Sequence, residues 1–327
     1  MSLLVEGAPR ASNSGGEPGI TGGHSAGDRI FRAVALLAGL LVLVILGLIA
    51  VSTTHGAWAW FSSQGLSIFG TKWDPAKNQF GILAFLYGTL ITALIAVVIA
   101  VPVSIAVALL MTEVVPKRFA RPIVYLIDLL AVIPSVVFGL WGILILAPKL
   151  SSLYASIASG VKGIPVLDSL FGSPTSGASF FTAGIILAIM ITPIIISISR
   201  EVIATTPAME KEGAYALGAT RLEMIRGAVW PHSMGGVVGA VLLGLGRAMG
   251  ETIAVALVIG SSATITSHLF APGDSMPAVI ANQFGEASGI SRAGLMGLGV
   301  LLFVLTIIIN MAARGYMARA LRKARGL

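Results

Sequence analysis

The sequence lacks cysteine altogether, which removes three kinds of site. A chain of 327 residues without cysteine has no disulfide framework, no thiolate nucleophile and no zinc–thiolate centre. Its four histidines are scattered, with no spacing that suits a metal ion, so no metal site is predicted. The phosphate-binding pattern G-x-x-x-x-G-K-[ST] is absent too. Any ATP hydrolysis therefore requires a separate subunit, and we predict no catalytic residue in this chain.

Charge is the second shortage, and it points to a membrane. Only 11% of the residues are charged and 56% are hydrophobic, with a mean hydropathy of +0.94, whereas soluble domains carry about 25% charge. A span needs roughly 20 mainly apolar residues. The sequence therefore predicts an all-α integral membrane protein with six spans, at residues 31–52, 82–111, 123–146, 180–199, 236–261 and 294–313.

The positive charge is distributed as a topology signal. With both termini inside, fifteen Lys and Arg residues fall on the inner side, five fall in the outer loops, and Arg247 lies within a span. This asymmetry predicts a multi-pass protein of the cell membrane with both termini in the cytoplasm. We expect a disordered cytoplasmic tail over 1–28, a transmembrane domain over 29–315 and a basic cytoplasmic tail over 316–327. Membrane lipid, not nucleic acid, explains the net charge of +7.

The loop at 200–234, on the predicted cytoplasmic side, reads as two short helices. Thr206 and Pro207 suit the start of the first helix, and Gly218 suits its left-handed end. Thr220-x-x-Glu223 is a capping box that starts the second helix. Pro231 is expected to stop that helix before the fifth span. Such an element can dock into a groove of a partner, although capping signals alone fit an ordinary loop equally well.

The stretch "GLGRAMGETIAV" (244–255) places two charges inside the fifth span. If the span is one helix, Arg247 and Glu251 lie four residues apart on one face and can pair. Gly235, Gly239, Gly246 and Gly250 form a separate stripe that would let another helix approach closely. Arg247 would meet an anion that crosses the membrane, and Glu251 would hold the arginine when no anion is bound. The alternative is a salt bridge that only fixes helix packing.

Asp128 is a secondary candidate in the third span. It lies near the predicted cytoplasmic end and can pair with a basic residue there, such as Arg200. Pro134 and Ser135 are expected to bend this span. A structural role is the preferred interpretation, because residues near span ends can reach water.

Several motifs resemble a known family. Glu212-Gly213-Ala214, Gly218 and Pro231 are similar to the EAA loop of ABC-importer permeases, although Gly213 replaces the alanine of that pattern. "KWDPAKNQFGILAFLYGTL" (72–90), "LLAVIPSVVFGLWG" (129–142) and "LGLGRAMGETIAVALVIG" (243–260) resemble the PstC-type permeases of phosphate importers. The resemblance implies the six-helix, MetI-like architecture of type I importers.

The resemblance also implies a function and its partners. The chain would be the permease subunit of an ATP-driven importer of inorganic phosphate that works by alternating access. It would pair with a homologous PstA-type permease and two PstB-type ATPase subunits, and receive phosphate from an extracytoplasmic PstS-type binding protein. The EAA-like residues would dock on the ATPases, and Arg247 and Glu251 would lie on the phosphate path. ATP and Mg would bind the partner subunits and no cofactor would bind this chain.

Two other classes remain as alternatives. An ion- or proton-coupled anion transporter would couple transport through Glu251 and Asp128. This interpretation leaves the loop at 200–234 unexplained. An inverted internal repeat would support it, but none is evident in the sequence. An intramembrane hydrolase would need a nucleophile with a base, or a metal site. The chain offers neither cysteine nor a histidine within its predicted spans.

Overall fold

The computed structural model describes residues 26–172, 174 and 176–324, and within these ranges the chain is almost entirely helical. Its α-helices are α1 (Ala26–Gln64), α2 (Leu83–Leu109), α3 (Lys117–Val132), α4 (Ser135–Trp141), α5 (Ala147–Val161), α6 (Pro165–Phe171), α7 (Phe180–Ala204), α8 (Ala208–Ala216), α9 (Arg221–Met224), α10 (Trp230–Gly250), α11 (Ile253–Val258), α12 (Met276–Gln283) and α13 (Gly289–Ala324). The 3₁₀ turn η1 (Gly65–Phe69) precedes a two-stranded hairpin, in which a second 3₁₀ turn, η2 (Pro75–Lys77), connects β1 (Trp73–Asp74) to β2 (Gln79–Phe80). Trp73 pairs with Phe80 in this hairpin. Three π-helical segments are η3 (Leu110–Val114), η4 (Gly142–Leu146) and η5 (Ile225–Val229).

The chain divides into two compact units, Met1–Val51 and Ser52–Leu327. The described part of the first unit is the N-terminal stretch of α1. Its residues 33–51 carry no charge and are mainly apolar, as expected of a membrane-spanning helix. The helix begins at Ala26, so the last three residues of the tail predicted over 1–28 are helical. Residues 1–25 lie outside the described part of the chain.

The prediction of six spans is confirmed. Six described helical stretches are long and apolar enough to cross a membrane, at Gly27–Phe69, Leu83–Val114, Ser135–Val161, Phe180–Ala204, Arg221–Gly250 and Gly289–Gly315. α13 continues to Ala324, so most of the basic tail predicted over 316–327 is helical, and residues 325–327 are not described.

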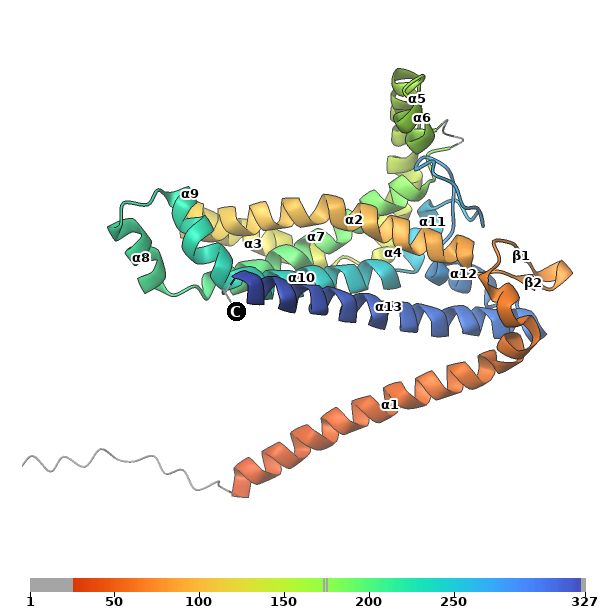
Figure 1. Ribbon diagram of the computed structural model, residues 1–327, viewed down its shortest axis with the longest axis horizontal. Coiled ribbons are helices and arrows are strands. Elements are labelled where there is room, and N and C mark those ends of the chain that lie inside the picture. The colour runs from red at the N-terminus through yellow and green to blue at the C-terminus, as the bar shows by residue number, and fades with distance from the viewer. Residues whose placement is uncertain (1–25, 173, 175, 325–327) are drawn as a thin grey trace, which may run out of the picture. The chain divides into compact units, whose positions relative to one another are not determined.

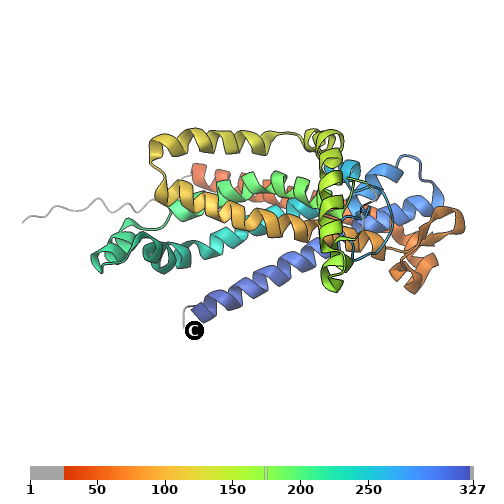
Figure 2. The ribbon, with the colours of Figure 1, turned by 90° about the horizontal axis from the view of Figure 1, so that it is seen from above.

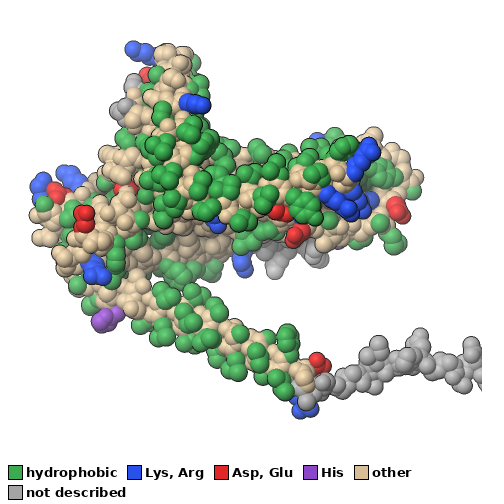
Figure 3. Space-filling model, turned by 180° about the vertical axis from the view of Figure 1, so that it is seen from behind, with side chains coloured by type: hydrophobic (Ala, Val, Ile, Leu, Met, Phe, Trp, Pro, Cys, Tyr) green, Lys and Arg blue, Asp and Glu red, His purple; other side chains and the backbone are tan. Residues whose placement is uncertain are grey.

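The second unit is organised around α7. This helix packs against α2, α10 and α3, and these helices run alongside one another in two perpendicular views (Figure 1, Figure 2). Its Ile186, Ile191 and Ile195 are fully buried in the main core. The other helices expose apolar side chains outward, and Figure 3 shows such side chains along the bundle, with basic side chains near both of its ends. A helix that is apolar all round thus occupies the centre, as expected for a fully buried segment.

Two predicted spans are interrupted. The third, expected over 123–146, breaks between α3 and α4 at Ile133 and Pro134, whose backbones are extended. This break confirms the predicted bend, since proline disfavours the helical conformation of the residue before it. After η4, α5 turns across the direction of the bundle (Figure 1, Figure 2). The fifth span, expected over 236–261, starts earlier and is interrupted after Gly250.

Candidate functional site

The helix that carries Arg247 ends before it reaches Glu251. α10 stops at Gly250, and Glu251 has an extended backbone with φ −71° and ψ 127°. The Glu251 Oε1 atom accepts a hydrogen bond of 3.4 Å from the amide of Ala254, in the first turn of α11 (Ile253–Val258). The prediction that Arg247 and Glu251 share one helix face was therefore wrong. No ion pair joins them in the described part of the chain.

Arg247 instead is exposed in a groove between α10 and α13. The groove has a volume of about 850 Å³. It is lined by Gly235, Val238, Gly239, Leu242, Leu243, Gly246, Arg247, Ile307, Asn310, Met311 and Arg314. Arg247 and Arg314 are its two charged residues, and no carboxylate lines it. A groove with two permanent positive charges, an amide and an otherwise apolar wall favours an anion.

Three residues of the predicted glycine stripe, Gly235, Gly239 and Gly246, line this groove. A Cβ atom built on Gly239, Gly246 or Gly250 meets nothing within 4 Å. The close approach to α7 is made by a different face of α10, where a Cβ on Gly236 would lie 2.4 Å from Val202 Cγ1. A Cβ on Gly244 would likewise lie 2.8 Å from two side-chain atoms of Ile195. The stripe was correctly identified as a small-residue face, but its assignment as the packing face was wrong within this chain.

The loop at 200–234 contains α8 and α9, with a corner at Gly218. Gly218 has φ +86°, a left-handed conformation that favours glycine, and this confirms the predicted helix end. The capping box of Thr220 and Glu223 is present. Thr206 does not cap α8: Pro207 is the residue before the helix, and the buried Thr206 hydroxyl has no hydrogen-bond partner.

Pro231 does not stop the second helix of the loop, contrary to the prediction. The chain stays helical from α9 through η5 into α10, and Pro231 lies in the first turn of α10. A proline lacks the amide hydrogen of the regular helical ladder and clashes with the preceding turn. The wider π turn of Ile225–Val229 directly before it provides a local accommodation of this kind.

Two side-chain contacts hold α8 against the bundle, and the sequence did not reveal either. Lys211 Nζ lies 2.5 Å from Glu113 Oε1, and the Glu113 side chain is only 7% exposed. Glu210 Oε1 lies 3.5 Å from His232 Nδ1 on α10. Glu113 belongs to η3, at the end of the second span, 98 residues before Lys211 in the chain. No local pattern links residues so far apart, so only the fold could reveal this pair.

The other EAA-like residues remain on the surface of the loop. Glu212, Gly213 and Gly218 are exposed, and a Cβ on either glycine would meet nothing within 4 Å. Ala214 packs partly against the small core that includes Met224 and Val229. Large apolar side chains are also exposed here, with Met209 at 83% and Leu217 at 91%. An exposed apolar patch beside polar residues is typical of a protein-interaction surface.

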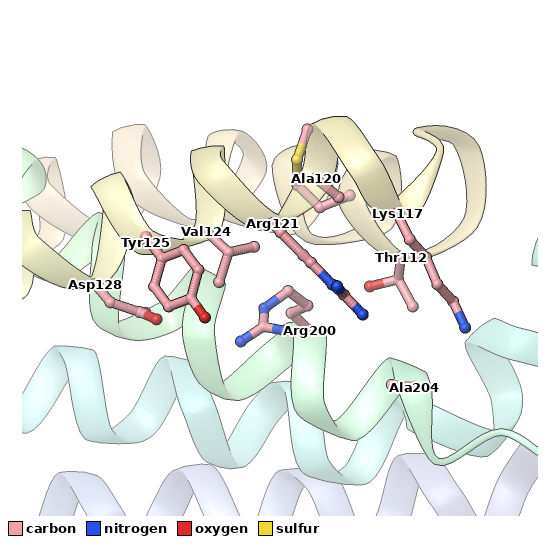
Figure 4. Close-up of a pocket in the computed structure, with 10 residues that line it drawn as sticks. Thr112, Lys117, Ala120, Arg121, Val124, Tyr125, Asp128, Arg200 and Ala204 are labelled. Atoms are coloured by element: carbon pink, nitrogen blue, oxygen red, sulfur yellow. The ribbon is translucent and has the colours of Figure 1, made fainter.

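Asp128 and Arg200 do line one cavity, which lies between α3, η3 and α7 and has a volume of about 420 Å³. They form no ion pair among the residues that the structure describes. In the view of Figure 4, the Tyr125 ring stands between Asp128 and Arg200, and Arg121 reaches toward Arg200 from α3. The predicted Asp128–Arg200 pairing was therefore wrong, although the two residues are neighbours.

Most of the chain is similar to known membrane transport proteins. Residues 100–323 match the family of binding-protein-dependent transport system inner membrane components. The chain belongs to this family. It is 44% identical to the phosphate transport system permease protein PstC of Mesorhizobium japonicum, with 89% of this chain and 90% of that protein aligned. It is 40% identical to PstC of Haemophilus influenzae, with 88% and 92% aligned. The resemblance to PstC-type permeases is confirmed.

Solved structures agree on the fold of the family. The chain superimposes on a subunit of a bacterial ABC transporter involved in the import of the acidic polysaccharide alginate, with a TM-score of 0.55 and 17% identity. The superposition covers 89% of this chain and 97% of that subunit. It also superimposes on a chain of the inward-facing MetNI methionine ABC transporter, with a TM-score of 0.52 and 17% identity. Here 76% of this chain and 99% of the MetNI chain are covered. The MetI-like permease architecture is thereby confirmed. Family membership favours a permease subunit with a separate ATPase over the ion-coupled and hydrolase alternatives.

Proposed function

We propose that this chain is the transmembrane permease subunit of an ATP-driven importer of inorganic phosphate. Its PstC-type relatives support the substrate, and Arg247 supplies the physical argument. Arg247 is exposed in a groove that holds no carboxylate, at the end of α10 and next to a break in the fifth span. A guanidinium binds phosphate through two parallel hydrogen bonds and stays charged at any working pH.

The break after Gly250 gives the site a second feature. A helix interrupted at membrane depth is tolerated where it lines a cavity or is buried in protein, and transporters place substrates at such interruptions. We place the PstA-type permease against the groove, so that phosphate passes Arg247 at the boundary between the two subunits. The exposed glycines then leave room for the partner helix and the anion. Glu251 lies directly beyond the break, where its carboxylate accepts the Ala254 amide hydrogen bond and does not pair with Arg247.

The test of this path is phosphate uptake by an Arg247→Gln variant of the assembled transporter. We expect uptake to be lost while the subunits still co-purify, because glutamine keeps the polar length but removes the charge. Arg247→Lys should restore uptake only in part, since an ammonium is a point charge without the planar fork. Arg292→Gln is the matched control, because Arg292 stacks on the Phe284 ring and does not line the groove. Normal uptake by Arg247→Gln would refute this role.

The loop at 200–234 is proposed to couple the permease to two PstB-type ATPase subunits, which would hold ATP and Mg. The supporting observation is the exposed surface of α8, where Glu212 lies beside the apolar Met209 and Leu217. Gly218→Val should strain the left-handed corner. We expect this variant and Glu212→Lys to reduce co-purification of the ATPases or transport-stimulated ATP hydrolysis. Unchanged coupling in both variants would argue against docking through this loop.

The orientation of the chain is part of the proposal. We place α8, α9 and both termini in the cytoplasm, because most Lys and Arg residues fall on that side. The hairpin β1–β2 and the segments around α5 and α12 would then face the PstS-type binding protein outside. Tags at both termini should be inaccessible to reagents outside intact cells, and an accessible terminus would overturn this orientation.

A further inference from the structure

The cavity between α3, η3 and α7 contains a concentration of positive charge that the proposed transport path does not use. Lys117 and Arg121 reach it from α3, and Arg200 reaches it from the facing helix α7 (Figure 4). Asp128 is its one carboxylate. Arg247 lies in a different groove, on α10, so the two basic sites are separate.

The three cations lack anionic partners in the described structure. None of them forms an ion pair with a carboxylate there, although Asp128 lines the same cavity. The Nε atom of Arg200 is buried and has no hydrogen-bond acceptor. A buried donor on a charged group is costly when it is left unsatisfied, and like charges on facing walls repel. An anion with several acceptor oxygens, bound between the helices, offsets the repulsion between these cations.

The size and surroundings of the cavity narrow the ligand. Guanidinium groups on opposite walls, with an ammonium at the rim, match the oxygens of a phosphate group. The volume of about 420 Å³ leaves room for more than a bare phosphate ion. Farther along α3, Leu126 and Leu129 are exposed and offer an apolar surface to acyl chains. Basic pockets between helices near the membrane surface suit the headgroups of anionic lipids.

We propose that Arg121, Arg200 and Lys117 bind the phosphate group of an anionic molecule between α3 and α7. The source is either the headgroup of an anionic phospholipid or inorganic phosphate, and both present the same oxygens to the cations. The bound group links the broken third span to the central helix at the end of the bundle that carries α8.

The experiment uses the purified transporter complex without its binding protein. One arm measures phosphatidylglycerol retained by the complex by native mass spectrometry, with zwitterionic phosphatidylcholine as the comparison lipid. The other arm measures equilibrium binding of radiolabelled inorganic phosphate in an Arg247→Gln background, so that the proposed path does not contribute. We expect Arg121→Gln with Arg200→Gln to weaken one of the two ligands by about tenfold or more, since a hydrogen bond to a charged group is lost at each position.

Arg118→Gln is the matched control, because Arg118 is exposed on the same helix, stacks on the Phe119 ring and does not line the cavity. Loss of binding of one ligand in the double variant, with binding kept in Arg118→Gln, supports the site. The ligand that is lost shows whether the bound phosphate group belongs to a phospholipid or is inorganic phosphate. Equal binding of both ligands by the wild type and the double variant overturns it, as does an equal loss in Arg118→Gln. If the double variant does not assemble, Lys117→Gln with Arg121→Gln, both exposed positions, is judged by the same criteria.

Discussion

α10 presents glycines on two faces, and the two sets have opposite surroundings. Gly236 and Gly244 face α7, where side chains of Val202 and Ile195 occupy the space that a Cβ would need. Gly239 and Gly246 face the groove beside α13, where a Cβ would meet nothing. The same residue type therefore serves close packing on one face and leaves open space on the other. Arg247 lies on the open side, so the open glycines belong with the proposed path and the packed ones with the fold.

Filling the open face should have the largest effect on transport. Gly246→Leu places a bulky side chain into the groove next to Arg247, at a position where a Cβ atom meets nothing within 4 Å. We expect phosphate uptake to fall by about tenfold or more, because the anion and the partner helix lose the space they need. Uptake into proteoliposomes is the measurement.

The control for this prediction is Gly160→Leu in α5, where a Cβ also meets nothing within 4 Å. That variant should transport normally. If Gly246→Leu transports as well as Gly160→Leu, the groove is not on the path, and the contrast between the two faces would concern stability alone.

The packed face can be tested through stability. Gly236→Ala forces a methyl group toward Val202 and should destabilise the chain by about 1–3 kcal/mol. Gly239→Ala adds the same methyl group in open space and should be neutral or stabilising by up to about 1 kcal/mol, because alanine favours helix. Thermal unfolding of the purified complex compares the two variants directly. Similar melting temperatures would remove the distinction between the faces.

The sequence revealed the spans and the loop signals but not these two faces. Hydropathy located six spans, and short-range chemistry located the turn at Gly218 and the capping box at Thr220, because each depends on neighbouring residues. The helix break after Gly250 depends on tertiary context, since periodicity alone is consistent with a continuous helix across Arg247 and Glu251. Which glycine face packs against α7 is likewise determined by residues such as Val202, which lies on another helix.

α8 shows the same division between a fixed face and an open one. Lys211 is paired with the buried Glu113, whereas Met209 and Leu217 on the same loop are exposed. Lys211→Met should leave the Glu113 carboxylate without its partner and loosen α8 from the end of the second span. We expect fewer phosphate ions moved per ATP hydrolysed, with ATP hydrolysis itself less affected, as measured by parallel uptake and ATPase assays.

The conservative variant Lys211→Arg distinguishes charge pairing from the shape of the side chain. It keeps the positive charge and should recover most of the coupling. A Lys211→Met variant that couples normally would indicate that the loop is held by its apolar contacts alone.

The smallest effect is expected from removing the charge of Asp274, which is closely packed against Gly88 at the other end of the bundle. The backbone oxygen of Asp274 lies where a Cβ of Gly88 would be, and the Asp274 side chain is buried. Burial raises the pKa of the Asp274 carboxyl to about 6, against 3.8 for an ordinary aspartate. Between these two values the native state holds a proton that the unfolded chain has released, so stability falls as the pH rises through this window.

Asp274→Asn should therefore raise the melting temperature at pH 7.5, by about 4 °C, and raise it less as the pH falls toward 4. Asparagine keeps the oxygen that accepts the Ser275 amide hydrogen bond of 2.8 Å, so the packing is preserved while the charge is removed. Asp168→Asn, at an exposed position of helix α6, is the control for the same substitution away from this packed loop. A gain that is equal at both ends of the pH range would mean that the closely packed loop at Asp274 accommodates the charge without cost.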